Sequence, residues 1–370
     1  MSSLNTNAFF PKKGLSGETG PNQADLEKRA QAALSWLLQS IEATGGKGSA
    51  HHYSPFFGWG PAYPETTGYL IETLLDYAQL TGQAALQTTA LGCADWLLEV
   101  QLPNGAFPGG TLGNRHPSVF NTAQILFGLA RAQETRPTPQ TREAGVRALQ
   151  WLLAQLETDG SWRKWAYIAG FTPSYYTRAV WGVLKAAVVF QMPEVQPAMR
   201  QALHYYAERF QPNGTVRDWG FKAGTPAFTH TIAYTLEGFL ECALLLNETA
   251  VLQQTTQSAA RLWQIRQQNG QTAGRYDAQW KGDYGFTCPT GNAQLSVLYH
   301  RLWQTGGEPA FRTAASTLLL EVLPHQNLGR NPHRHGAIPG SAPFWGPYMR
   351  FRYPNWAAKF FLDAVASFEF

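Results

Sequence analysis

Apolar residues recur at intervals of three and four residues in twelve segments of this chain, separated by turns and by polar, aromatic stretches. This spacing places the apolar side chains on one face of a helix, where they pack against a core. The pattern predicts twelve helices, over residues 24–43, 66–81, 83–101, 118–132, 138–157, 174–191, 194–210, 229–246, 248–268, 290–304, 308–325 and 355–369. Long loops and short turns alternate between them, so we expect six helical pairs.

A glycine marks the turn after the first helix of every pair, at Gly45, Gly105, Gly160, Gly214, Gly270 and Gly329. The regular period indicates a repeat architecture that runs through almost the whole chain. We therefore expect a polar N-terminal leader over residues 1–23 and one all-α domain over residues 24–370. The second helix of each pair is the more apolar one, as in VFNTAQILFGLARA, and we expect it to be buried. Six inner helices inside six outer helices form an (α/α)6 toroid, with the six long loops at one end.

The turn segments carry a family resemblance. QLETDGSW (155–162) resembles the Gln, Gly, Trp repeat of the terpenoid cyclase and protein prenyltransferase superfamily, and QLPNGAF, QPNGTVRDW and QNGQTAGRYDAQW are looser copies. Other segments (GPAYPETTGY, SVFNTAQILFGL, FTHTIAY, FTCPTGNAQ, YPNWAAKFF) resemble toroid proteins associated with bacterial surface-polysaccharide biosynthesis. The resemblance implies the toroid, which also carries polysaccharide lyases, uronyl epimerases and glycosidases.

The chain departs from the terpenoid pattern. It has neither the Asp-x-Asp-Asp acid of class II cyclases nor the Asp-Asp-x-x-Asp magnesium motif of class I, and Asp283 and Cys288 are wrongly spaced for the prenyltransferase zinc site. The His51-His52 and His333-x-His335 pairs also lack the ligands that would complete a metal site. We expect no metal and no other cofactor, and terpenoid chemistry stays open as a less favoured reaction.

Charge and cysteine content narrow the classes of partner. The formal net charge is +4 over 370 residues, without the Lys and Arg runs of a nucleic-acid binder. The three cysteines show no C-x-x-C spacing, which favours a reducing compartment, and no segment offers about 18 continuous apolar residues for a membrane span. We expect a cytoplasmic protein that binds no nucleic acid, and the sequence leaves the oligomeric state open.

Polar residues occupy the first turns of the six expected inner helices: Glu65, Asn121, Arg178, His230, Asn292 and Asn355. These turns converge at one end, so the residues form a predicted ring around the toroid mouth. His230 and Tyr234 lie one helical turn apart and could abstract a proton, while Arg178 and Asn121 could neutralise a sugar carboxylate. We predict these four and Glu65 as catalytic residues of a uronate lyase or C5-epimerase. Helix capping by the asparagines and a hydrogen-bonded core histidine would be purely structural roles for the same residues.

Three further functions stay open. The first is a glycoside hydrolase, which would need two carboxylates across the mouth, and the candidates are Glu65, Asp218, Glu237, Asp277 and Asp283. The second is a terpenoid cyclase or transferase, and the third is a non-catalytic glycan-binding or assembly protein. Aromatic rings beside polar groups suit sugars, so we expect substrate contacts from Trp59, Tyr63, Trp162, Trp165, Asn292, Trp345, Tyr348 and Asn355. The expected partner is an acidic oligosaccharide or polysaccharide.

Overall fold

A computed structural model describes residues 22–369, so the predicted leader lies outside the described residues except for its last two positions. Twelve α-helices occupy the described part of the chain. They are α1 (Gln23–Glu42), α2 (Pro64–Thr81), α3 (Ala84–Val100), α4 (Val119–Thr135), α5 (Pro139–Ala154), α6 (Thr177–Phe190), α7 (Gln196–Ala207), α8 (Thr229–Leu246), α9 (Thr249–Asn269), α10 (Pro289–Gly306), α11 (Pro309–Val322) and α12 (Asn355–Glu369).

Three predicted helices are shorter than expected because one end of each forms a separate 3₁₀ turn. These turns are η1 (Ser174–Tyr176), η2 (Pro193–Val195) and η3 (Leu323–His325). Proline lacks an N–H group, so Pro197 and Pro324 cannot donate to the carbonyl four residues earlier, and the regular α-helical ladder is interrupted beside η2 and within η3.

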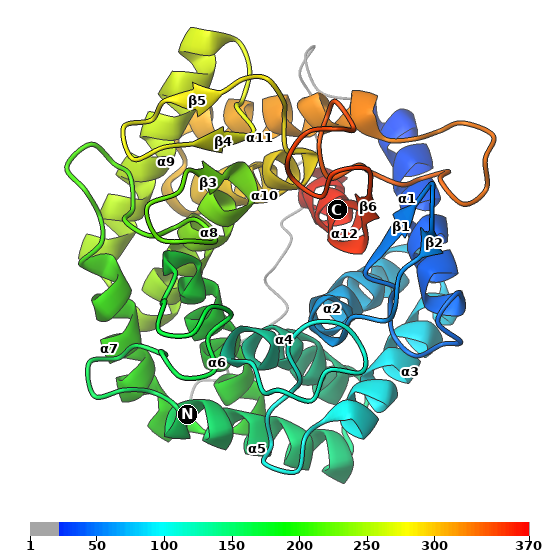
Figure 1. Ribbon diagram of the computed structural model, residues 1–370, viewed down its shortest axis with the longest axis vertical. Helices are drawn as coiled ribbons and strands as arrows, with labels where there is room; N and C mark the ends of the chain where they lie inside the picture. The colour runs from blue at the N-terminus through cyan, green and yellow to red at the C-terminus, as the bar shows by residue number, and fades with distance from the viewer. Residues whose placement is uncertain (1–21, 370) are drawn as a thin grey trace.

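The helices form the predicted (α/α)6 toroid, with the even-numbered helices inside and the odd-numbered helices outside (Figure 1). Each inner helix contacts the next around the ring, and α12 closes it against α2. Every outer helix packs on the inner helix that precedes it through a short turn, and α1 packs on α12. The two ends of the described chain therefore meet in the ring.

Glycines let the inner helices approach each other closely. A Cβ atom added to Gly128 of α4 would lie 2.1 Å from the carbonyl oxygen of Gly68 on α2. A Cβ added to Gly68 would lie 2.5 Å from the Cα of Ile125. Both distances are too short for any side chain, so these two positions require glycine.

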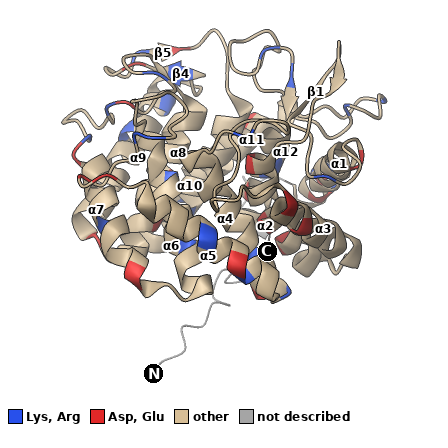
Figure 2. Cartoon of the chain, turned by 60° about the horizontal axis from the view of Figure 1, so that its bottom comes forward, with Lys and Arg blue, Asp and Glu red and all other residues tan. Residues whose placement is uncertain are grey.

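The long loops gather on one face of the toroid, as expected, and contain short strands that the sequence did not predict (Figure 2). One sheet has the order β2-β1-β6, from β1 (His52–Ser54), β2 (Gly58–Trp59) and β6 (Tyr353–Pro354). The other has the order β3-β4-β5, from β3 (Ala227–Phe228), β4 (Arg275–Tyr276) and β5 (Gly282–Asp283). All pairs are antiparallel. The first sheet joins the first and last loops across the closure of the ring.

None of the helices in residues 22–369 combines the length and apolarity needed to cross a bilayer.

Candidate functional site

The candidate site lies at the mouth of the toroid, where the inner helices begin. All six predicted first-turn residues are buried there. Their side chains do not all meet. Glu65, Arg178 and His230 belong to one connected region, because the charge of Arg178 acts on both of the other groups.

Asn292 and Asn355 are used in packing the helices. The Nδ2 of Asn292 donates to Glu321 of the outer helix α11 at 2.9 Å. The Nδ2 of Asn355 donates to the hydroxyls of Ser49 and Thr66, each at 2.8 Å. These contacts fix helices and loops to each other. The Oδ1 of each asparagine is buried without a described partner, so their substrate contacts stay predictions.

Glu65 is the second residue of α2 and is buried below the mouth. The Tyr63 hydroxyl donates to its Oε2 at 2.5 Å. Burial raises the pKa of Glu65 from 4.5 to about 7, although the Tyr63 hydrogen bond and the charge of Arg178 both act in the opposite direction. The raised pKa favours the protonated carboxyl of Glu65 well above the pH at which an exposed glutamate ionises.

Glu65 differs in one respect from the other described carboxylates of the inner helices, because it forms no ion pair. The others pair with Lys or Arg: Glu72 with Lys185, Asp76 and Glu134 with Arg131, Glu237 with Arg178, Glu241 with Arg301, and Asp363 with Lys359. A buried carboxyl without a cation is costly when ionised, and such groups concentrate at functional sites.

Asn121 lies beside Tyr63, which is the hydrogen-bond partner of Glu65. Its Oδ1 accepts from the Ser118 hydroxyl at 2.9 Å, and Ser118 also caps α4. Asn121 is close to the Tyr63 hydroxyl, but its buried Nδ2 makes no hydrogen bond of normal length with a described residue. A buried donor without a partner is available to bind a water molecule or a ligand.

Arg178, in the first turn of α6, is enclosed by other side chains. It forms an ion pair with Glu237 of α8, and its Nε donates to Gln124 of α4 at 2.9 Å. Four rings lie within 5.4 Å of the guanidinium carbon: Phe127, Trp181, Tyr234 and Phe360. The guanidinium is thus neutralised and covered, which leaves it poorly placed to bind a substrate carboxylate directly.

His230, in the first turn of α8, is held in its neutral form. Burial lowers its pKa to about 4, and the charge of Arg178 acts in the same direction. Its Nδ1 lies 2.7 Å from the Oε1 of Gln294 and donates to that oxygen, which can only accept. The lone pair is then on Nε2, which has no hydrogen-bond partner among the described residues. The Tyr234 ring lies 4.4 Å from the imidazole, as the predicted pairing on one helix face requires.

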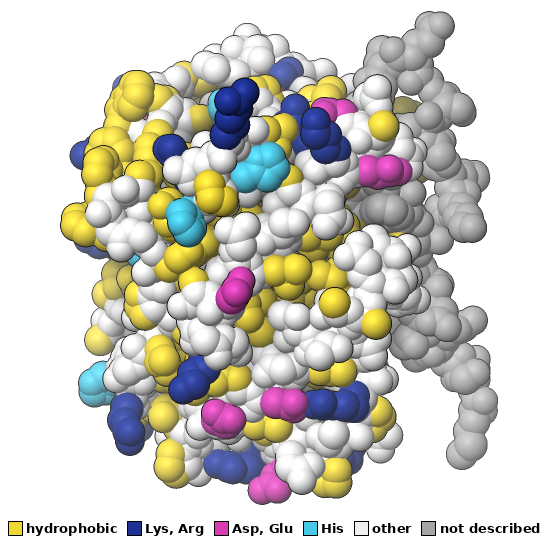
Figure 3. Space-filling view, turned by 90° about the vertical axis from the view of Figure 1, so that its right-hand side faces the viewer, with side chains coloured by type: hydrophobic (Ala, Val, Ile, Leu, Met, Phe, Trp, Pro, Cys, Tyr) yellow, Lys and Arg dark blue, Asp and Glu magenta, His cyan; other side chains and the backbone are white. Residues whose placement is uncertain are grey.

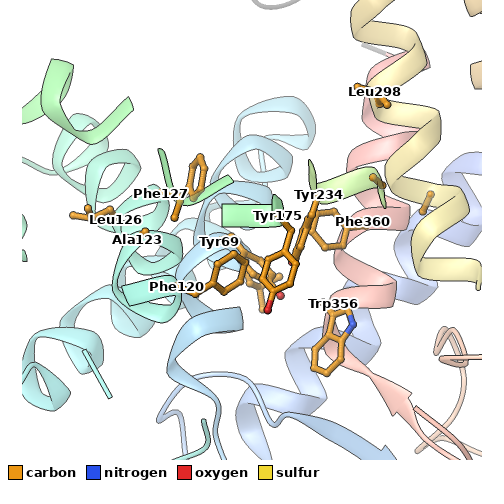
Figure 4. Close-up of a cluster of buried hydrophobic side chains, with 14 of the residues drawn as sticks. Tyr69, Phe120, Ala123, Leu126, Phe127, Tyr175, Tyr234, Leu298, Trp356 and Phe360 are labelled. Atoms are coloured by element: carbon orange, nitrogen blue, oxygen red, sulfur yellow. The ribbon is translucent and has the colours of Figure 1, made fainter. Parts of the chain in front are cut away.

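Aromatic side chains contact Arg178 and His230. They belong to a cluster of buried hydrophobic side chains (Figure 4). Rings from different elements point toward one common region; the labelled ones are Tyr69, Phe120, Tyr175, Tyr234, Trp356 and Phe360. Phe120 contacts Tyr175 with ring centroids 5.1 Å apart, and Tyr234 contacts Phe360 at 5.7 Å. Buried rings lower the local polarity, which is the cause of the shifted pKa values of Glu65 and His230.

The predicted aromatic contacts fall into two groups. Tyr63 bonds Glu65, and Tyr348 lies 5.3 Å from the His230 ring and accepts a hydrogen bond from Trp356, so both belong to the mouth. Trp162 is fully buried and donates to the Leu152 carbonyl at 2.9 Å, which leaves no face for a sugar.

Three other tryptophans lie in the long loops. Trp59 packs on Trp36 of α1, with ring centroids 5.2 Å apart. Trp165 and Trp345 are exposed in the loops. The sugar contacts of Trp59, Trp165 and Trp345 therefore stay predictions, and they concern the loops and not the buried mouth.

Sequence reasoning missed two glutamines that hold the site. Gln124 bonds Arg178 and Gln294 bonds His230, and the Nε2 atom of each glutamine is buried without a described partner. Their signal was present, since a glutamine on an otherwise apolar inner helix is costly unless it is hydrogen-bonded. Gln124 also follows Asn121 by three residues, on the same helix face.

The histidine pair of the first loop lies at the edge of the mouth. The Nδ1 atoms of His51 and His52 are 2.8 Å apart, and the His51 ring contacts Tyr63 and Trp356 at 4.9 Å. Burial lowers the pKa of His51 to about 3, so the ring is neutral. Within residues 22–369 no group of three or more His, Cys, Asp or Glu side chains could hold a metal ion.

Comparison with known proteins places the fold. No protein-family model and no curated protein sequence matches the chain. Solved structures do match over nearly the full length. An unsaturated glucuronyl hydrolase specific for heparin is 14% identical, with a TM-score of 0.75 over 94% of this chain and 97% of that one.

Two further structures have the same arrangement. The cellobiose 2-epimerase from Bacillus thermoamylovorans is 11% identical, with a TM-score of 0.70 over 93% of this chain and 100% of that one. A novel α-amylase from Clostridium perfringens is 11% identical, with a TM-score of 0.68 over 92% and 98%. The predicted resemblance to terpenoid cyclases is not shown by these structures. At such low identity the likeness establishes the (α/α)6 toroid and not the reaction.

Proposed function

We propose that this protein is a carbohydrate-active enzyme that hydrolyses a glycosidic bond with Glu65 as the general acid. The observation that carries the proposal is the carboxyl of Glu65, which is buried at the mouth without an ion pair and whose pKa is raised by burial to about 7. A general acid must hold its proton near the working pH, and a pKa of about 7 meets that condition. The toroid neighbours, which are named as hydrolases or an epimerase of sugars, support the same class.

The proposed step uses two groups. The Glu65 carboxyl donates its proton to the glycosidic oxygen as the bond from that oxygen to the anomeric carbon breaks. Neutral His230 accepts a proton on Nε2 from a water molecule whose oxygen bonds the anomeric carbon. Asn121 Nδ2 and the Tyr63 hydroxyl are the hydrogen-bonding groups that would orient the sugar beside Glu65.

The proposed hydrolase differs from the one predicted from the sequence, which would use two carboxylates across the mouth. Glu237 is paired with Arg178, and Asp283 is paired with Arg275 in the β4–β5 hairpin, so neither is a free partner for Glu65. Asp218 and Asp277 stay open as candidates for the second carboxylate. We assign water activation to His230, because its neutral imidazole can accept a proton on Nε2. The ion pair of Arg178 with Glu237 also removes that cation from a substrate carboxylate, so a uronate lyase would depend on Asn121 as its donor.

Sugar epimerisation is the second candidate. The neutral imidazole of His230 beside Tyr234 is suited to removing a proton from carbon, as the sequence predicted. The acidic character of the glycan, the C5 position and the cytoplasmic location all stay predictions.

One experiment separates these reactions. Purified protein is incubated with a panel of neutral and uronate-containing oligosaccharides in deuterated water. New reducing ends indicate hydrolysis, solvent deuterium in the unreacted or isomerised sugar indicates epimerisation, and absorbance of an unsaturated uronate indicates a lyase.

The site assignment is tested with single substitutions. Glu65→Gln and His230→Ala are each expected to lose at least about 100-fold in kcat, the usual scale for an acid–base group. Glu99→Gln, an exposed residue of the outer helix α3, serves as the control. The parental pH profile should fall below about pH 4, where His230 is protonated, and above about pH 7, where Glu65 is ionised. Full turnover by folded Glu65→Gln would remove the acid from the proposal.

A further inference from the structure

The hairpin of the first loop carries two phenylalanines at its tip. Strands β1 and β2 are joined through Pro55, Phe56 and Phe57, with Ser54 paired to Gly58. Phe56 is 69% exposed and Phe57 is 88% exposed. The only ring contact of Phe57 among the described residues is with Phe56, at a centroid distance of 6.4 Å. Two adjacent large apolar side chains that are exposed to water at a hairpin tip indicate an interaction surface.

The last loop extends the same apolar surface. Phe56 contacts Phe351, with ring centroids 5.9 Å apart, and Phe351 in turn contacts Phe344 at 5.8 Å. Phe351 is 38% exposed and the neighbouring Trp345 is 63% exposed. We call Phe56, Phe57, Trp345 and Phe351 the aromatic rim. Figure 3 shows hydrophobic side chains gathered on the edge of the molecule that carries the loops, with Lys and Arg side chains beside them.

The segments that form the aromatic rim carry positive charge and no negative charge. Residues 51–63 and 326–356 contain no Asp or Glu, whereas the whole chain has 25 acidic and 29 basic residues. The second segment contributes the arginines Arg330, Arg334, Arg350 and Arg352. None of the four takes part in an ion pair of the described residues. The surface thus combines exposed rings with uncompensated positive charge.

We propose that the aromatic rim docks on the surface of an anionic lipid bilayer. Phenylalanine and tryptophan side chains gain free energy by entering the boundary between headgroups and acyl chains, and nearby arginines are attracted to anionic headgroups. The hairpin tip, with Phe57 standing free of other elements, has the shape needed to enter that boundary.

An acidic polysaccharide is the competing ligand, because it would also be attracted to the four arginines. Sugar rings stack on aromatic faces that a scaffold holds flat, as Trp356 and Tyr63 are held in the mouth. Phe57 has no such support, so the geometry favours lipid. The proposal does not depend on the proposed hydrolysis, since no residue of the rim belongs to the buried site.

The test is co-sedimentation of the full chain with vesicles of phosphatidylcholine alone or mixed with phosphatidylglycerol. We expect binding to the anionic vesicles that weakens with added salt. A Phe56→Ser/Phe57→Ser variant should bind about tenfold less tightly or worse. Arg350→Gln/Arg352→Gln should lose the preference for phosphatidylglycerol.

The matched control is Val188→Ser/Leu245→Ser, which changes two exposed apolar residues near the C-terminal ends of α6 and α8, away from the long loops. This variant should bind like the parent, and circular dichroism should show all variants folded. Absence of binding to anionic vesicles would overturn the proposal, as would equal losses in the control. Binding to soluble hyaluronan without binding to vesicles would assign the surface to a polysaccharide instead.

Discussion

Replacing Glu65 with Gln is expected to stabilise the protein at alkaline pH, although it removes a hydrogen-bonded side chain. Because burial raises the pKa of Glu65, the folded state binds its proton more tightly than the unfolded state does. Below pH 4.5 both states are protonated and the carboxyl costs nothing. As the pH rises from 4.5 to about 7, the unfolded state loses its proton first, and folding stability falls.

The size of this loss follows from the two pKa values. The difference between 4.5 and about 7 corresponds to about 3 kcal/mol at about 1.4 kcal/mol per pKa unit, reached in full above pH 7. Glutamine cannot ionise, and its carbonyl oxygen can still accept the hydrogen bond from Tyr63. After the weaker hydrogen bond is allowed for, Glu65→Gln should be more stable than the parent by about 2–3 kcal/mol at pH 8. The two proteins should be about equally stable near pH 4.5.

The assay is guanidinium unfolding at several pH values, with Glu72→Gln as the control on the same helix. Burial opposes ionisation of Glu72, but its ion pair with Lys185 outweighs burial and lowers the pKa. The ionised Glu72 therefore adds stability at neutral pH, and this is lost as the pH falls through its lowered pKa. Glu72→Gln should lose stability at pH 8 where Glu65→Gln gains it. Parallel pH curves for the parent and Glu65→Gln would refute the reasoning.

Two further predictions concern packing. Arg178→Met should lower the free energy of unfolding by about 3–5 kcal/mol by leaving Glu237 without its cation, and Arg178→Met/Glu237→Leu should recover much of the loss. A thermodynamic cycle in guanidinium checks this, and simply additive losses would contradict it. Gly128→Ala should cost about 1–3 kcal/mol because the new Cβ would meet the Gly68 carbonyl oxygen. Gly92→Ala, which has open space around it, should show no such cost in the same thermal melts.

The toroid could be predicted because its signals are local and repeated. Apolar spacing sets each helix, and the alternation of long loops and short turns places every inner helix start at one end. Helix ends were less accurate where proline interrupts the α-helical ladder, as at Pro197 beside η2. The closure of the ring also brings the first and last loops together, and these two loops pair in the sheet β2-β1-β6.

The site could be predicted only to the level of helix and turn. Successive helical residues differ by about 100° in direction, so a position in the first turn does not say which way a side chain faces. His230 faces the mouth, whereas Asn292 faces the outer helix α11. The pairing of Arg178 with Glu237 joins residues 59 apart in the sequence, and no local pattern specifies it.

The ion pairs of the inner helices explain why Glu65 is the residue to test first. A buried ion pair adds little net stability, since desolvation offsets the attraction, but removing one partner is costly. The pairs Glu72–Lys185, Glu237–Arg178 and Asp363–Lys359 can therefore be understood as parts of the packed fold. Packing gives no such explanation for Glu65. No cation forms an ion pair with its carboxylate, and its ionisation lowers the stability of the fold. A buried carboxyl whose ionisation costs stability is explained if its exchangeable proton is used in catalysis.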